Sequence, residues 1–71
     1  MRIIEALETI VENRSNKAVN YAVNYAKVAL NMKRGSEAFR TQLEYVRGNI
    51  VYWRGARAKQ VRKAISEELS R

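Results

Sequence analysis

The side chains best suited to bind a ligand in this 71-residue chain are concentrated in residues 43–63, where basic residues surround the only tryptophan, Trp53. Residues 33–63 carry nine lysines and arginines against two glutamates, in a chain of net charge +7. A basic excess confined to one half indicates an anionic partner, or else a solvated surface that keeps a small protein soluble. The candidate residues for an anionic partner are Arg47, Arg54, Arg57, Lys59, Arg62 and Lys63.

Few residue types in the chain are suited to catalysis. Cysteine, histidine and aspartate are absent, so a nucleophile or general base would have to be Glu, Lys, Tyr, Ser or Thr. We expect the seven glutamates on outer helix faces or near the C-terminus, and the three isolated glycines form no phosphate-binding loop. The sequence therefore predicts a protein that is not an enzyme and that uses no metal or other cofactor.

Two kinds of binding function remain. The break at Arg54-Gly55 resembles a helix-turn-helix in outline, and the basic residues that follow it could reach phosphates and base edges of a nucleic acid. Alternatively, the chain is a protein-interaction module, because tyrosines on two sides of the molecule and Trp53 beside Arg54 are typical of interface hot spots. Trp53 could equally be a core residue at a helix junction.

The elements that must position these residues are helices. Apolar residues recur at helical spacing over residues 2–12, 15–33, 37–53 and 56–70, and no segment alternates as a strand would. Asn13 or Ser15 could cap the second helix, whereas Gly35 and Ser36 mark the clearest boundary in the chain. The sequence thus predicts a single all-α domain over residues 1–71, a bundle of three to four helices in which the first and third close a core around the second. The residues expected to dominate the core are Ile3, Leu7, Val19, Val23, Leu30, Phe39, Leu43, Val46, Ile50, Trp53, Val61 and Ile65.

The second helix has apolar residues on more than one face. One stripe contains Val19, Val23 and several alanines, and a second stripe on nearly the opposite side contains Tyr21, Tyr25, Val28 and Met32. Because one neighbour cannot cover both stripes, we expect the tyrosine stripe to form the interface of a homo-oligomer. Asn20, Asn24 and Asn31 lie between the stripes, either as a solvated polar face or as one that could read base edges.

The third helix is expected to continue to Trp53, with an apolar face that Ala38, Tyr45 and Tyr52 widen on one flank. No apolar run reaches the ~20 residues of a membrane span, and the N-terminus does not resemble a signal peptide. We therefore expect a cytoplasmic protein without a membrane partner.

Two stretches of the sequence carry a resemblance to known proteins. These are Asn20-Tyr21-Ala22 with Tyr25-Ala26-Lys27, and the stretch from Gln42 through Trp53-Arg54-Gly55 to Arg62. Over residues 20–63 the chain resembles short uncharacterised proteins encoded by tailed bacteriophages. The resemblance implies a small accessory role inside a bacterial host cell and brings no catalytic or binding residues with it. Our leading hypothesis is a non-catalytic accessory protein that acts as a basic helical interaction module, either protein-binding or regulatory, with a host protein as a candidate partner. The alternative is a nucleic-acid-binding protein that uses the basic face of residues 47–63.

Overall fold

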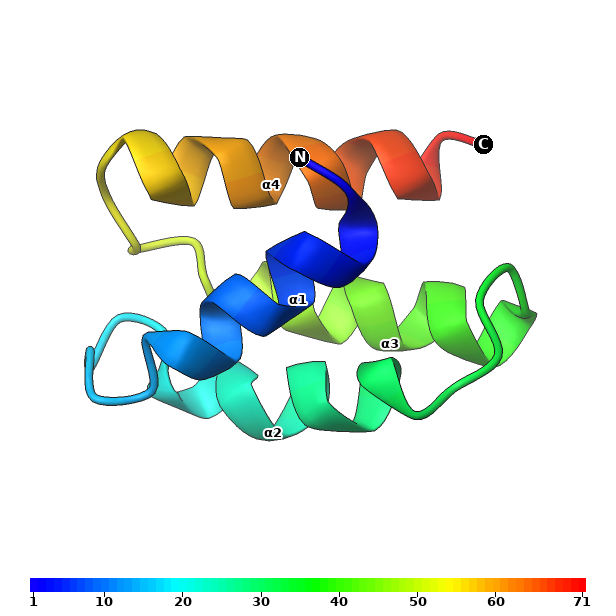
Figure 1. The fold of residues 1–71 in the computed structure, drawn as a ribbon, viewed down its shortest axis with the longest axis horizontal. Helices are drawn as coiled ribbons and strands as arrows, with labels where there is room; N and C mark the ends of the chain where they lie inside the picture. The colour runs from blue at the N-terminus through cyan, green and yellow to red at the C-terminus, as the bar shows by residue number, and fades with distance from the viewer.

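The computed structural model describes residues 1–71, which form four α-helices and no β-strand. The helices are α1 (Ile3–Glu12), α2 (Asn20–Leu30), α3 (Glu37–Gly48) and α4 (Ala56–Leu69). In Figure 1, α2, α3 and α4 run antiparallel in succession, while α1 crosses them obliquely. The predicted all-α bundle is confirmed. The longest helix has 14 residues, and none offers the apolar length that a membrane crossing requires.

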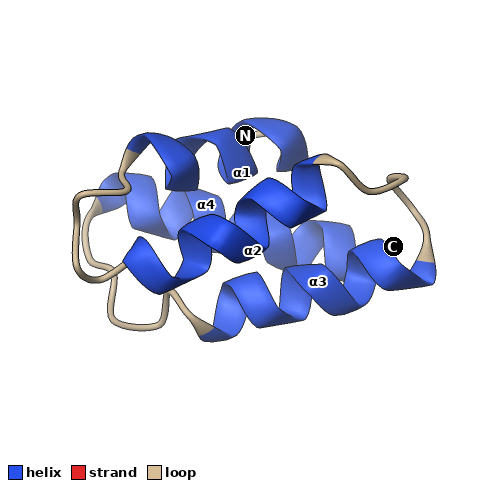
Figure 2. Ribbon diagram, turned by 90° about the horizontal axis from the view of Figure 1, so that it is seen from below, coloured by secondary structure: helices blue, strands red, loops and turns tan.

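Helix packing follows a closed circuit. α1 packs against α2 and α4, and α3 packs against the same two helices, whereas the backbones of α1 and α3, and those of α2 and α4, do not approach each other closely. α2 is therefore flanked by the first and third helices, as the sequence predicts. It does not occupy the centre of the molecule, however, because its outer face has no neighbouring helix (Figure 2).

The core is built from the residues that the apolar periodicity predicts. All twelve predicted core residues are buried except Leu30, which is partly buried and packs against the others. Ile10 and a set of small side chains complete the core, and these small residues allow the helices to approach closely. They are Ala6, Ala22, Ala26, Ala29, Ala58 and Ala64.

The predicted start of the second helix is wrong by five residues, because asparagines hold residues 13–19 in turns. The Asn13 side chain donates a hydrogen bond back to the Thr9 carbonyl at 2.7 Å, which ends α1. Asn16 Oδ1 accepts a hydrogen bond from the Ala18 amide at 2.8 Å. Such local bonds compete with helical ones, so α2 begins only at Asn20, and neither Asn13 nor Ser15 caps it.

The boundary predicted at Gly35 and Ser36 is confirmed. Gly35 has a φ of +86°, a conformation that only glycine adopts without strain. Ser36 Oγ accepts a hydrogen bond from the Phe39 amide at 3.1 Å and so caps α3. α2 itself already ends at Leu30, three residues earlier than predicted.

The third helix is shorter than predicted, because it ends at Gly48 instead of Trp53. Glycine is a poor helix former, and the side chain of the next residue, Asn49, donates to the Tyr45 carbonyl at 2.8 Å. Residues 49–55 form an irregular connection, the α3–α4 loop. Ile50 and Trp53 are still buried, so both leave the helix without leaving the core.

Candidate functional site: a basic surface and a tyrosine surface

The end of α3, the α3–α4 loop and the first half of α4 carry five cations that the protein itself leaves unpaired. None of them forms an ion pair, since both ion pairs in the structure belong to Glu68. All five are exposed, and we call them the basic surface: Arg47, Arg54, Arg57, Lys59 and Lys63.

The start of α4 strengthens the positive potential of this surface. The first turn of α4 holds no acidic residue, and its N-cap, Gly55, offers no side chain to the free amides. A helix N-terminus carries partial positive charge, so acidic residues would be expected there, yet Arg54 and Arg57 stand at this end. Lys59 and Lys63 follow one turn apart on the outer face of α4.

Arg62, the sixth predicted anion-binding residue, is held by the protein. Its Nη1 donates hydrogen bonds to the carbonyl of Trp53 at 2.7 Å and to that of Ile50 at 3.3 Å. These bonds tie α4 to the α3–α4 loop and satisfy two carbonyls that no helix pairs. We therefore assign Arg62 a role in positioning the loop and leave it out of the basic surface.

The helix-turn-helix outline does not match the structure. The turn of that motif has three or four residues, whereas the α3–α4 loop spans residues 49–55. The loop also carries two buried apolar side chains, Ile50 and Trp53. Trp53 is therefore a core residue at a helix junction, which was one of the two interpretations of its sequence position.

A second surface gathers all four tyrosines of the chain. The rings of Tyr25 on α2 and Tyr45 on α3 pack together, with centroids 5.7 Å apart and planes tilted by 33°. Tyr21 lies one turn before Tyr25, and it lines a hollow of about 480 Å³ together with Tyr52. The exposed apolar residues that form this tyrosine surface are Tyr21, Tyr25, Val28, Tyr45, Val51 and Tyr52.

The tyrosine surface corrects two expectations from the sequence. The tyrosines were expected on two sides of the molecule, but the packing of α3 beside α2 brings them together. Tyr45 and Tyr52 were expected to widen the buried face of the third helix, yet both are exposed. Of the predicted oligomer interface, Tyr21, Tyr25 and Val28 are exposed, while Met32 is partly buried against the core.

The asparagine face of α2 is solvent-exposed. Asn31 uses its side chain to donate to the Lys27 carbonyl at 3.0 Å, where it caps the C-terminal end of α2. Asn20 and Asn24 form no side-chain hydrogen bond within the protein.

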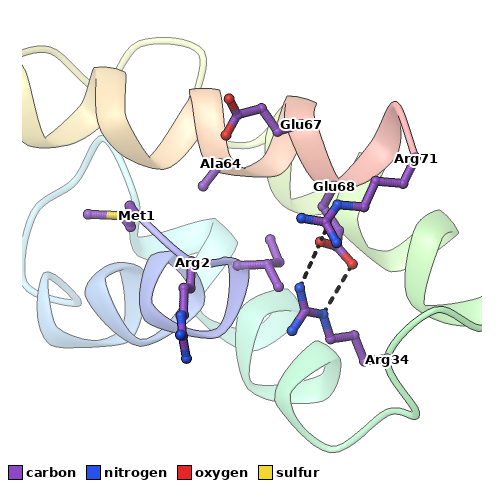
Figure 3. A pocket seen from close by; sticks show the side chains of 8 residues that line it. Met1, Arg2, Arg34, Ala64, Glu67, Glu68 and Arg71 are labelled. Atoms are coloured by element: carbon purple, nitrogen blue, oxygen red, sulfur yellow. Dashed lines mark hydrogen bonds and ion pairs between the residues drawn. The ribbon is translucent and has the colours of Figure 1, made fainter.

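An ion pair that the sequence does not predict joins the connection between α2 and α3 to the C-terminal end of α4. Arg34, in the connection between α2 and α3, donates two hydrogen bonds to Glu68 of α4, at 3.2 and 3.1 Å (Figure 3). Glu68 lies near the C-terminus, as the sequence predicts, but its side chain is only 10% exposed. Arg71 lies 3.8 Å from the same carboxylate, beside a cavity of about 220 Å³.

The arginines determine the protonation of Glu68. The hydrogen bonds from Arg34 hold the pKa of Glu68 below its ordinary value, against burial, which raises it. The charges of Arg34, Arg71 and Arg40 lower the Glu68 pKa further. In return, Glu68 raises the pKa of Arg34. Arg40 also donates to the Leu69 carbonyl at 2.6 Å, so three arginines fasten the end of α4.

No group of three acidic side chains comes together in a way that could hold a metal ion. Comparison of the chain with known protein families, with curated proteins and with solved structures finds no match. The basic surface and the tyrosine surface are therefore the features of the molecule that bear on its function.

Proposed function

We propose that this protein is a non-catalytic interaction module that binds an acidic partner protein through the basic surface. The observation that carries the proposal is the concentration of five exposed, unpaired cations within residues 47–63, a stretch that contains no acidic residue. Unpaired cations on a small rigid scaffold attract an anionic surface and guide its approach. A small accessory role in a bacterial host, encoded by a phage, fits this proposal.

Nucleic-acid binding is the second candidate. The placing of Lys59 and Lys63 one turn apart on the outer face of α4 favours it, because two aligned cations could contact successive phosphates. The length of the α3–α4 loop argues against insertion of α4 in the manner of a helix-turn-helix. Binding of this kind would depend on charge more than on base sequence.

Fluorescence anisotropy with two labelled probes distinguishes the candidates. One probe is a polyglutamate peptide and the other is a duplex DNA, each titrated over a salt series. Tighter binding of the peptide supports the acidic protein partner. Tighter binding of the duplex, with a log affinity that falls steeply and linearly with log salt, supports nucleic acid. If neither probe binds at low salt, the proposal is wrong.

The double charge reversal Lys59→Glu and Lys63→Glu locates the binding surface. We expect it to weaken binding of the preferred probe at least tenfold, a change of about 1.4 kcal/mol, without loss of helicity in circular dichroism. Arg14→Glu with Lys27→Glu is the matched control, because it makes the same change in net charge at exposed residues outside the basic surface. Equal weakening by both double variants would show a general charge effect and would contradict the assignment of the surface.

A further inference from the structure

The tyrosine surface leaves a large aromatic area exposed to solvent. Tyr21 and Tyr52 are 77% and 78% exposed, and Tyr45 is about half exposed. With about 200 Å² for each fully exposed ring, the four tyrosines leave roughly 500 Å² in contact with water. That area equals the largest apolar patches of monomers and approaches the ~800 Å² per partner of a standard interface.

Charged residues are nearly absent from this surface, although the chain as a whole is rich in them. The residues one helical turn from Tyr25 and Val28 are alanine, asparagine, methionine and tyrosine. Those one turn from Tyr45 are Thr41, Gln42, Gly48 and Asn49. Lys17 is the one charged residue among those that line the hollow beside Tyr21 and Tyr52. Depletion of charge around exposed aromatic rings is the composition of an interface centre.

The composition of the tyrosine surface also indicates which partner can bind to it. Tyrosine hydroxyls and the amides of asparagine and glutamine both donate and accept hydrogen bonds, so two identical copies of this surface can satisfy each other across a two-fold axis. A surface of one charge could not pair with itself in this way. Because each copy carries a net charge of +7, two copies approach with least repulsion through the face that is almost free of charge.

We infer that the tyrosine surface is the interface of a symmetric homodimer, in which Tyr21, Tyr45 and Tyr52 of one copy pack against the same surface of a second copy. This inference does not depend on the proposed function, since the tyrosine surface and the basic surface share no residue. Tyr45 and Arg47 are two residues apart on α3 and therefore point in nearly opposite directions. A dimer formed in this way leaves both basic surfaces free.

Sedimentation equilibrium of the purified chain over a range of concentrations tests the inference. We expect the mass to rise from 8.2 kDa towards twice that value at micromolar concentrations, as for a small interface. Salt should tighten the dimer, because it screens the repulsion between two cationic copies. Binding to an anionic probe weakens with salt, so the two activities respond in opposite directions.

Tyr21→Arg should raise the dimer dissociation constant at least tenfold. Ser66→Arg is the control, because it adds the same charge on an exposed residue of α4 and should leave the dissociation constant within about twofold. Tyr52→Arg makes the same test at the part of the tyrosine surface that lies in the α3–α4 loop, and it should also weaken the dimer. Circular dichroism verifies that each variant is folded. A mass of 8.2 kDa up to about 1 mM in high salt overturns the inference, and so does a dimer that both tyrosine variants leave intact.

Discussion

The indole of Trp53 is enclosed by the core although it projects from a loop, and only 5% of the residue is exposed. Trp53→Ala would leave a large cavity at the junction of α3 and α4. We expect the free energy of unfolding to fall by about 3–5 kcal/mol, measured by urea denaturation with far-ultraviolet circular dichroism. Gln60→Ala is the control, because Gln60 is exposed and belongs to neither surface. A near-neutral effect of Trp53→Ala would show that the indole is a surface contact.

The ion pair between Arg34 and Glu68 makes the free energy of unfolding depend on pH. The folded-state pKa of Glu68 lies below its unfolded value, so its contribution is present above the unfolded value and is lost as the pH falls through the folded pKa. We expect Glu68→Gln to lower stability at neutral pH and to flatten the fall in stability in acid, below the ordinary pKa of a glutamate. Urea denaturation at a series of pH values measures both effects.

Glu67→Gln is the matched control for Glu68. Glu67 is the preceding residue, is exposed and forms no ion pair, so its change should leave the pH profile of the wild type nearly intact. A Glu68→Gln variant that loses stability in acid as steeply as the wild type would show that the ion pair does not contribute.

At the scale of elements, Arg62 joins α4 to the α3–α4 loop through the carbonyls of Ile50 and Trp53. Arg62→Met keeps the length of the side chain and removes both hydrogen bonds, so we expect it to lower the free energy of unfolding by about 1–3 kcal/mol. Lys59→Met removes the same charge from an exposed residue of α4 and should change stability little. Equal effects of the two variants in urea denaturation would contradict the positioning role of Arg62.

The helices and the core could be predicted from the sequence because both follow from apolar periodicity. Ile50 and Trp53 show why the core prediction holds even where the helix prediction fails, since both residues are apolar and stay buried in a loop. The first residue of α2 and the last residue of α3 could not be predicted from apolar periodicity. They depend on side-chain hydrogen bonds of Asn16 and Asn49 to the backbone, which compete with the helix over a few residues.

The candidate surfaces were predictable to different degrees. The basic surface follows from charge counting, except for Arg62, whose carbonyl partners lie in a loop that the sequence placed in a helix. The shared surface of the four tyrosines depends on which side of α2 faces α3, and a single sequence does not determine that. The pair of Arg34 with Glu68 joins residues 34 positions apart, beyond the reach of any local pattern.

At the scale of the whole molecule, the exposed aromatic residues and the unpaired cations lie on different parts of the fold. The tyrosine surface lies on α2, α3 and the start of the α3–α4 loop, whereas the basic surface occupies the end of α3, the end of that loop and α4. The proposed dimer would carry two separate basic surfaces, one on each copy. A partner long enough to contact both basic surfaces would bind more tightly than a partner that contacts one.

The closed circuit of helix contacts has a consequence for the kinetics of folding. Three of its four contacts join helices that follow one another in sequence, and only the contact between α1 and α4 joins distant segments. Local contacts form quickly, because they close short stretches of chain, whereas the last one requires most of the chain to be ordered first. The seam between α1 and α4 should therefore form late in folding, and weakening it should speed unfolding while leaving the folding rate nearly constant.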